Sequence, residues 1–439
     1  MKVAFLTLGC KVNFYETEKM IEQFQRNGFS VVGFSERADI YVINTCTVTN
    51  MADRKSRQMI HRAKKKNPDS IVVAVGCYVE SGGEKLLEDA SLDAAFSNRE
   101  KETVVERIIQ QFHLSENRQE NLPEGGISQG DSGKDYERTR AYLKIQDGCN
   151  QFCTYCAIPY VRGGGVLSST PADEVVERVR ELAEKGYKEV VLTGIHVSSY
   201  GVDFSGEKNF VKLQGRPLAD VMEQISHVKG VERIRMSSLE PRIITRSFLE
   251  EISTIPKICP HFHLSLQSGC DTVLKRMNRH YDTGEYKEKL DMIREYYRDP
   301  AITTDIIVGF PGETNEEFEV TREFLRMIQL ADIHVFKYSE RTGTRAAQMP
   351  DPVSPEIKNV RSEQLIEDTK KYRKEYCERF LGTKQNVLFE ETVVEKGETY
   401  LTGHNERYVK IGVPIEKAME NGYKQNEIRE VLVENILSK

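Results

Sequence analysis

Three closely spaced cysteines constrain this chain more than any other feature. Cys149, Cys153 and Cys156 form a C-x3-C-x2-C run directly after a strand-like segment at residues 142–148. Three thiolates this close can bind one face of a cubic iron–sulfur cluster, but they leave its fourth iron without a protein ligand. The run therefore predicts a [4Fe-4S] cluster whose open iron binds something that is not protein.

A zinc site is the main alternative for these cysteines. Zinc prefers closed sites with four ligands, and no fourth cysteine or histidine follows the run at the spacing of a zinc finger. His196 is the nearest downstream candidate for a fourth ligand. The spacing thus favours an iron–sulfur cluster over zinc or a group of free thiols.

Length and composition bound the class of protein. A chain of 439 residues is too long for one hydrophobic core, and its 39% hydrophobic and 30% charged residues are typical of a soluble protein. No apolar stretch is long enough to cross a bilayer, and the first residues lack the organisation of a signal peptide. We expect a cytoplasmic protein without a membrane association, in which the nine cysteines serve metal or cluster binding. The net charge of −6 still leaves room for a local basic face.

Three apolar, β-rich runs near the N-terminus each end in a cysteine. The runs and the helical segments that alternate with them cover residues 3–10, 14–27, 40–46, 53–66, 71–77 and 84–90. This alternation predicts a parallel sheet covered by helices. Ligands collect at the carboxyl ends of strands in such sheets, so Cys10, Cys46 and Cys77 are expected to converge on a second three-ligand site. Three unrelated buried thiols are the alternative.

A polar segment at residues 115–135 predicts a linker or mobile loop between a first domain, 1–114, and a second, 136–375. Six strand candidates alternate with helices in the second domain and predict a partial (β/α)6 barrel of the TIM kind. They cover residues 142–148, 189–193, 233–239, 261–267, 302–308 and 332–338. Thr170 is expected to cap the helix at 170–185, with Asp173 returning a bond to the cap.

Polar or glycine-rich groups follow five of the six strand candidates, at the end of a barrel where catalytic groups gather. Glycine at these positions lets the backbone approach a ligand closely, although an ordinary turn is the alternative for any single position. The predicted cofactor-binding residues are Tyr155, Thr193, Gly194, Ser238, Glu240, Gln267 and Gly309.

The last domain, 376–439, contains short alternating runs spaced like those of a small antiparallel β-barrel. Small barrels of this type bind RNA through exposed aromatic and basic groups. The candidates here are His404, Arg407, Tyr408 and Lys410. An ordinary surface position is the alternative for each of them.

Together these motifs resemble the radical S-adenosylmethionine (SAM) methylthiotransferases over nearly the whole chain. The resemblance implies a cluster domain, a radical SAM domain and a C-terminal TRAM domain. It implies that Cys149, Cys153 and Cys156 bind the radical-generating [4Fe-4S] cluster, and that Cys10, Cys46 and Cys77 bind an auxiliary one. Motifs at residues 8–13, 44–49, 192–196 and 237–241 resemble the branch that acts on N6-threonylcarbamoyladenosine in tRNA.

The residues after the first cysteine distinguish the branches. Relatives acting on isopentenyl-adenosine tRNA usually have Gln-Met-Asn there, and relatives acting on ribosomal protein S12 usually have Pro-Lys-Asn. This chain has Lys11-Val12-Asn13, which favours the threonylcarbamoyladenosine branch and leaves the other two as alternatives. Lys11, His196 and Glu240 are the first candidates for residues that select the substrate.

The resemblance implies a radical reaction at C2 of the adenine next to the anticodon. The C2–H is not acidic enough for a side-chain base, so a hydrogen-atom or radical route must replace acid–base catalysis. SAM would be cleaved reductively to a 5′-deoxyadenosyl radical, and the auxiliary cluster would hold the sulfur that is methylated and delivered. The expected partners are tRNA, an electron donor such as a flavodoxin, and a sulfur source.

A basic helix in the first domain is a candidate tRNA contact. Residues 53–66 contain seven lysines or arginines in fourteen positions, and Arg62, Lys64 and Lys65 are the predicted RNA-binding residues among them. A solvated helix face is the alternative.

One segment departs from the family. Relatives usually have several arginines after the cluster loop, but here Arg162 is followed by Gly163-Gly164-Gly165-Val166-Leu167-Ser168-Ser169, to which no role is assigned. Two rival classes remain open at this point. One is a ferredoxin-like electron carrier, and the other is a zinc-containing RNA-binding protein.

Overall fold

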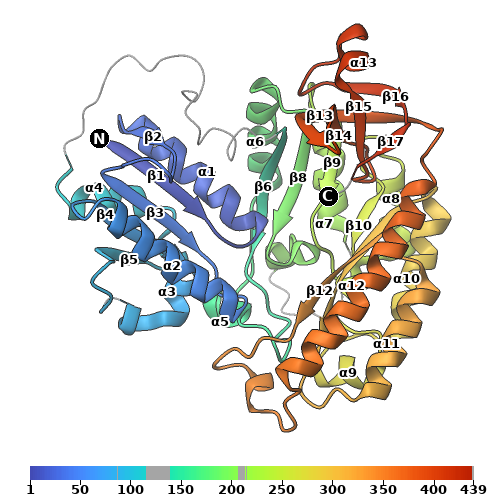
Figure 1. Cartoon of the computed structure of the whole chain (residues 1–439), viewed down its shortest axis with the longest axis horizontal. Helices are drawn as coiled ribbons and strands as arrows, with labels where there is room; N and C mark the ends of the chain where they lie inside the picture. Colours follow the sequence, from blue (N-terminus) through green and yellow to red (C-terminus); the bar gives the residue numbers. More distant parts are fainter. Residues whose placement is uncertain (87, 115–138, 206–212, 214, 438–439) are drawn as a thin grey trace. The chain divides into compact units, whose positions relative to one another are not determined.

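The computed structural model describes residues 1–437 except 87, 115–138, 206–212 and 214, so the linker predicted at 115–135 lies outside the described residues. The chain divides into two compact units (Figure 1). Unit 1 comprises Met1–Arg138, Gly148–Val166 and Ser339–Thr344, and unit 2 comprises Thr139–Asp147, Leu167–Tyr338 and Arg345–Lys439. The loop with Cys149, Cys153 and Cys156 therefore groups with the N-terminal residues.

Unit 1 is built on a five-stranded parallel sheet with the order β2-β1-β3-β4-β5. Its strands are β1 (Lys2–Thr7), β2 (Ser30–Val32), β3 (Ile40–Thr45), β4 (Ile71–Gly76) and β5 (Ala94–Phe96). The helices of the unit are α1 (Lys11–Arg26), α2 (Asn50–Lys66), α3 (Cys77–Gly82), α4 (Val104–Gln111) and α5 (Ile158–Val161), with short 3-10 turns η1 (Gly83–Leu86), η2 (Asn98–Glu100) and η4 (Gly163–Gly165). The parallel sheet predicted for the N-terminal region is confirmed.

Both faces of this sheet are buried, which explains why its strands are continuously apolar. On one face Phe5 and Val42 pack in a cluster with Phe24 of α1 and Ile108 of α4. On the other face the alternate residues, such as Tyr41 and Ile43, pack with Met59 and Ile60 of α2. The helical segment predicted at about residues 84–90 overlaps the 3-10 turn η1, and the helix α3 precedes it, beginning directly at Cys77.

Unit 2 contains two sheets that carry the six parallel strands predicted for the central region. One has the order β7-β6-β8-β9 and the other β10-β11-β12. The strands are β6 (Arg140–Asp147), β7 (Ser168–Ser169), β8 (Glu189–Gly194), β9 (Arg233–Met236), β10 (His261–His263), β11 (Ala301–Val308) and β12 (Asp332–Lys337). Isolated bridges, Ile234 to Ile258 and Leu239 to Leu264, link the two sheets. Only β7 runs antiparallel to its neighbour in these sheets.

Helices follow the strands of unit 2 along the chain (Figure 1). They are α6 (Ala172–Glu184), α7 (Arg216–Ser226), α8 (Arg246–Ser253), α9 (Asp271–Arg276), α10 (Thr283–Tyr296), α11 (Asn315–Ile328) and α12 (Pro355–Glu378), with 3-10 turns η5 (Val197–Ser199), η6 (Val202–Ser205), η7 (Pro241–Ile243) and η8 (Arg345–Gln348). Among the described residues, no helix is both long and apolar enough to span a membrane.

The capping box predicted for the helix at 170–185 is wrong. Helix α6 begins at Ala172 after Pro171, which makes no side-chain cap bond. Thr170 instead continues the extended segment of β7, because its N–H donates to the carbonyl of Ile145 at 2.8 Å. The end of the helix is as predicted, since Gly186 follows it with a φ of +90°.

The C-terminal part of unit 2 is a five-stranded antiparallel sheet with the order β16-β13-β14-β15-β17. Its elements are β13 (Lys384–Glu395), β14 (Glu398–His404), β15 (Lys410–Pro414), α13 (Ile415–Glu420), β16 (Ile428–Leu432) and β17 (Asn435–Ile436). Lys396 and Gly397 form a two-residue turn between β13 and β14 with positive φ at both positions, as a hairpin of this length favours. The antiparallel sheet predicted here is confirmed.

Candidate functional site

The three N-terminal cysteines lie at the carboxyl ends of neighbouring strands, as predicted. Cys10 follows β1, Cys46 follows β3 and Cys77 follows β4. Cys46 and Cys77 are each 4% exposed, whereas Cys10 is exposed. The pKa of Cys46 is raised to about 11, chiefly by burial, and the nearby Cys77 and Cys10 contribute to the rise by charge repulsion. The three thiols therefore share one neighbourhood.

Close backbone packing holds these cysteines together. A Cβ atom at Gly9 would lie 2.8 Å from the Cβ of Cys46, and Gly9 has a φ of +105° that favours glycine. The side-chain amide of Asn13 donates to the carbonyls of Leu8 at 2.7 Å and Thr45 at 3.0 Å. Asn13 thus fixes the end of β1 to the end of β3.

The second cysteine triplet occupies the loop between β6 and α5. Cys149, Cys153 and Cys156 are half-buried, and the N–H of Cys156 donates to the carbonyl of Cys153 at 3.0 Å. Phe152 within the loop has a φ of +47°. A Cβ atom at Gly165 would lie 2.8 Å from its ring, so this glycine makes room for Phe152. That contact gives one residue of the glycine run a structural role.

Two side chains connect the segments of the two triplets inside unit 1. Asn98 donates to the sulfur of Cys77 at 3.4 Å and to the carbonyl of Val161 at 2.9 Å. Arg162 donates to Oδ1 of Asn13 at 2.8 Å and to both carboxylate oxygens of Glu16. Sequence reasoning missed Asn98 and Glu16 and noted Asn13 only within the motif after Cys10, although Asn13 and Glu16 both lie on the first turns of α1.

The donor set of each triplet fits a cubic iron–sulfur cluster better than zinc. Each triplet offers three free thiols, whereas structural zinc sites are closed by four ligands. A cubic cluster can take one thiolate on each of three irons and leave its fourth iron open.

The predicted cofactor-binding residues of unit 2 lie at or after strand ends: Thr193 and Gly194 are the last residues of β8, and the others follow β9, β10 and β11. Thr193, Glu240 and Gln267 are buried and Ser238 is exposed. A Cβ atom at Gly194 would lie 2.8 Å from the carbonyl oxygen of Gln146, and the N–H of Gly309 donates to Glu313 at 2.6 Å. Glu240 accepts from Nε of Arg242 at 2.7 Å. Tyr155 belongs to the cluster loop of unit 1. Their role toward SAM stays a prediction.

His196 is held at the end of β8 with one ring nitrogen unused. The backbone N–H of His196 donates to Oε1 of Gln146 at 2.7 Å, and the ring Nδ1 lies 2.6 Å from Oγ of Ser199. Nε2 is buried and has no hydrogen-bond partner among the described residues. Burial, followed by the positive charges of Arg279 and Arg242, lowers the pKa of His196 to about 3. The imidazole is therefore neutral at pH 7.

The predicted RNA-binding residues of the C-terminal sheet already make contacts inside unit 2. His404 bonds to Glu390 at 2.8 Å and stacks on Tyr408 with ring centroids 4.4 Å apart. The guanidinium groups of Arg140 and Arg235 lie 4.6 and 5.1 Å from the centre of the Tyr408 ring.

The other two candidates in this sheet are also paired. Arg407 donates to the carbonyls of Arg298 and Asp299 at 2.9 Å, and Lys410 lies 3.6 Å from Glu391. Arg407 and Tyr408 thus contact residues outside the C-terminal sheet, whereas the side chains of His404 and Lys410 pair within it. RNA binding by all four residues stays a prediction.

The basic helix α2 presents an exposed cationic face. Its exposed lysines and arginines are Arg54, Lys55, Arg57, Arg62 and Lys65. Lys64, predicted to bind RNA with Arg62 and Lys65, instead pairs with Asp93 at 2.9 Å and donates to the carbonyl of Ser70 at 2.8 Å. The exposed face is thus available for phosphate contacts, whereas Lys64 is already engaged.

Two protein-family models match separate parts of the chain. Residues 143–325 match the Radical SAM superfamily, and residues 2–97 match the Uncharacterized protein family UPF0004. The solved radical S-adenosylmethionine methyltransferase TsrM from Kitasatospora setae aligns with a TM-score of 0.55 and 13% identity, covering 76% of this chain and 74% of that one. This likeness shows the fold alone.

Two relatives are similar in sequence over nearly their whole length. The chain is 40% identical to the threonylcarbamoyladenosine tRNA methylthiotransferase MtaB of Bacillus subtilis (strain 168), covering 93% of this chain and 89% of the relative. It is 36% identical to the tRNA-2-methylthio-N(6)-dimethylallyladenosine synthase of Thermodesulfovibrio yellowstonii, covering 88% and 86%. The chain therefore belongs to the radical SAM tRNA methylthiotransferases, in the family of the threonylcarbamoyladenosine enzymes.

Proposed function

We propose that this protein attaches a methylthio group to C2 of N6-threonylcarbamoyladenosine next to the anticodon of tRNA. The observation that carries the proposal is the 40% identity to a threonylcarbamoyladenosine tRNA methylthiotransferase over 93% of the chain. The Lys11-Val12-Asn13 sequence after the first cysteine supports the same substrate. The dimethylallyladenosine synthase at 36% identity supports a prenylated tRNA as the second candidate.

The reaction needs two open metal positions, and the chain offers two sets of ligands. Cys149, Cys153 and Cys156 would hold one [4Fe-4S] cluster, and Cys10, Cys46 and Cys77 would hold another. When bound, the clusters supply one-electron reduction of SAM and a place for the sulfur. The residues of the chain supply position, because Arg162 binds Asn13 on α1 and Asn98 joins Val161 of α5 to Cys77 of α3.

The finer fold assignments belong to the same proposal. The six parallel strands of unit 2 would form a partial (β/α)6 barrel, and the C-terminal sheet would be a TRAM domain. SAM would bind at the strand ends, where glycines and polar groups gather. The residues proposed for it are Tyr155, Thr193, Gly194, Ser238, Glu240, Gln267 and Gly309.

The remaining partners follow from the chemistry. A cytoplasmic electron donor of the flavodoxin type would reduce the first cluster, and a separate sulfur source would renew the transferred sulfur. The exposed cations of α2 would contact tRNA phosphates, since basic helix faces bind the nucleic-acid backbone without reading its sequence.

Discrimination between substrates should be steep. The threonylcarbamoyl group carries a carboxylate and a hydroxyl, whereas a prenyl group is apolar. A pocket that hydrogen-bonds the polar group rejects a substrate lacking it, because buried donors are left unpaired. His196 is suited to such a pocket, since its buried Nε2 has no partner among the described residues and two arginines lie nearby.

The experiment compares three substrates with the anaerobically reconstituted protein. They are tRNA bearing threonylcarbamoyladenosine, tRNA bearing isopentenyl-adenosine, and ribosomal protein S12, each assayed by mass spectrometry for a methylthio product. We expect turnover of the first substrate at least tenfold above the others. Comparable turnover of the prenylated tRNA would contradict the substrate assignment, and the absence of 5′-deoxyadenosine with every substrate would contradict the radical mechanism.

A further inference from the structure

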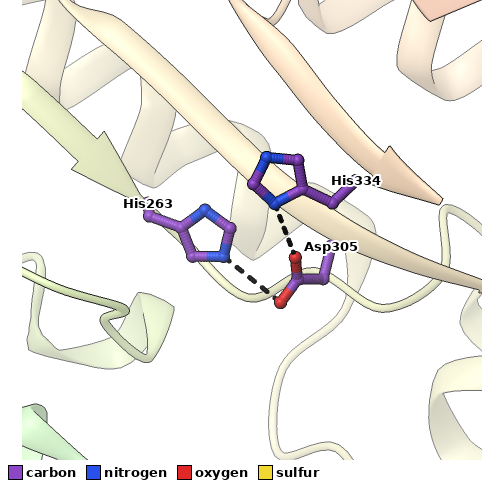
Figure 2. A group of neighbouring side chains, drawn as sticks. All are labelled: His263, Asp305 and His334. Atoms are coloured by element: carbon purple, nitrogen blue, oxygen red, sulfur yellow. Dashed lines mark hydrogen bonds and ion pairs between the residues drawn. The ribbon is translucent and has the colours of Figure 1, made fainter. Parts of the chain in front are cut away.

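Three ligand-type side chains meet on one face of the β10-β11-β12 sheet in unit 2 (Figure 2). His263 of β10 pairs in register with Thr303 of β11, and Asp305 of β11 pairs with His334 of β12. Because side chains two residues apart on a strand share a face, Asp305 projects on the same side as Thr303. The parallel register therefore places one carboxylate between two imidazoles.

The opposite face of these strands is filled by the core. Phe262, Thr304 and Ile306 alternate with the three ligand-type residues and are fully buried. Phe262 packs against Tyr297 after α10, with ring centroids 5.1 Å apart. The strands therefore have little freedom to rotate, and the cluster is held on a rigid support.

The distances inside the cluster match a metal site better than direct hydrogen bonds. Nε2 of His263 lies 3.3 Å from Oδ2 of Asp305, and Nδ1 of His334 lies 3.3 Å from Oδ1. Charge-assisted N–H···O bonds are shorter, about 2.7–2.9 Å. Two ligands of a tetrahedral ion with bonds of about 2.0–2.1 Å lie about 3.3–3.4 Å apart. All three ligand atoms lie within 4.8 Å of one another.

The side chains around the cluster orient its ligands. Nδ1 of His263 lies 2.9 Å from Oγ1 of Thr303, a contact that directs Nε2 toward Asp305. Histidines that bind metals usually use their other ring nitrogen in this way.

We propose that His263, Asp305 and His334 bind one divalent transition-metal ion of the zinc type, with an open position for water or an oxygen ligand. Two imidazoles and one carboxylate suit zinc or ferrous iron, whereas magnesium and calcium prefer sites made of oxygen alone. The side chain of His263 is 11% exposed, that of Asp305 27% and that of His334 47%, so one side of the site is open. The site shares no residue with the cysteine triplets and does not depend on the proposed substrate.

Zinc content of the cluster-loaded protein tests the site. The reconstituted holoprotein, whose cysteines are occupied, is incubated with zinc sulfate, desalted and analysed by mass spectrometry for metals. We expect about one zinc per chain, with zinc-edge X-ray absorption showing nitrogen and oxygen neighbours at about 2.0–2.1 Å. Sulfur neighbours at about 2.3 Å would overturn the proposal, because they would assign the zinc to cysteines.

Substitutions identify the ligands. Asp305→Asn and His334→Gln should each remove the bound zinc, and Thr303→Val should weaken its affinity about 10- to 100-fold because it loses the contact that orients His263. His227→Gln is the matched control, since His227 is exposed on the surface after α7 and 3.8 Å from Glu223. Equal zinc content in wild type, Asp305→Asn and His334→Gln would overturn the proposal.

A second measurement needs no variant. Zinc should raise the midpoint of thermal unfolding of the wild-type holoprotein, because a ligand that binds only the folded state stabilises it. Magnesium at the same concentration should not. An unfolding midpoint that zinc leaves unchanged would overturn the proposal independently of how any variant folds.

Discussion

Arg162 at the end of the cluster loop forms an ion pair with Glu16 of α1 at 3.0 Å, although 146 residues separate them in the chain. Their side chains are 2% and 8% exposed. Glu16 also pairs with Lys101, whose pKa is lowered by burial against the opposing effect of Glu16. Buried charges are stable only when they are paired, so this cluster fastens the loop after Cys156 to the helix after Cys10.

Replacing Arg162 should therefore cost far more stability than replacing a surface arginine. Arg162→Met removes the hydrogen bonds to Glu16 and Asn13 but leaves Glu16 paired with Lys101, so we expect a loss of about 1.5–3 kcal/mol in the free energy of unfolding. Denaturant titration measures it. Arg180→Met is the control, because Arg180 and Glu177 are 57% and 62% exposed and their pair should contribute less than about 1 kcal/mol. Equal losses in the two variants would contradict the role of the buried pair.

The two cysteine triplets should differ in function. Changing Cys149, Cys153 and Cys156 together to Ala should roughly halve the iron content and abolish 5′-deoxyadenosine formation, because the cluster that reduces SAM is lost. Changing Cys10, Cys46 and Cys77 to Ala should also roughly halve the iron but spare SAM cleavage while stopping methylthiolation. Iron analysis and product chromatography check both. Full iron content in the second variant would show that the N-terminal triplet binds no cluster.

His196 should make stability depend on pH in a defined window. Its pKa is about 3 in the folded protein and 6.5 when unperturbed, so the unfolded chain binds more protons as the pH falls. The stabilisation is complete above pH 6.5 and is lost toward pH 3, at most about 1.4 kcal/mol per pH unit. His196→Gln should remove this slope between pH 6.5 and about 5 in urea titrations. The exposed His227→Gln variant should keep the wild-type slope, and an identical slope for His196→Gln would refute the buried neutral imidazole.

The exposed face of α2 should contribute to tRNA affinity through phosphates. Replacing Arg62 and Lys65 with Gln should weaken binding and lower the slope of log affinity against log salt by about one unit for each lost phosphate contact. Lys64→Gln is the matched control on the same helix, because Lys64 already pairs with Asp93 and should leave the slope unchanged. A wild-type slope in the double variant would indicate a solvated helix face without a role in RNA binding.

Tyr408 should act in stability rather than in RNA recognition. Tyr408→Ala removes the stacking on His404 and the contacts with Arg140 and Arg235, and we expect a loss of about 2–4 kcal/mol in unfolding free energy. Tyr408→Phe keeps the ring and should lose less than about 1 kcal/mol. A filter-binding assay with tRNA supplies the second readout. A stable Tyr408→Ala protein with much weaker tRNA binding would restore the role predicted from the sequence.

The sequence by itself determined the elements that carry the cysteines. Continuous apolar runs predict buried parallel strands, and the position of Cys10, Cys46 and Cys77 after three of them placed these residues at one edge of the sheet. The six strands of unit 2 followed from the same local pattern. These predictions succeed because a strand that is buried on both faces consists of consecutive apolar residues, and this pattern is visible in the sequence alone.

The first residue of a helix was harder to predict where contacts in the folded protein compete with the local preference of the residues. Thr170 has the side chain of a helix cap, yet its backbone is held by Ile145 of β6 and the helix begins two residues later. Helix α3, which precedes the helical segment expected at about residues 84–90, begins at Cys77 immediately after β4. In both places a tertiary contact or the strand end sets the boundary.

Only the tertiary structure decided which distant side chains meet. The pair of Arg162 with Glu16, the packing of Tyr408 against Arg140, and the cluster of His263, Asp305 and His334 join residues far apart in the chain. Periodicity predicts which face of an element is buried, but it does not specify which element covers that face or in what register. The register of β10, β11 and β12 is what places one carboxylate between two imidazoles.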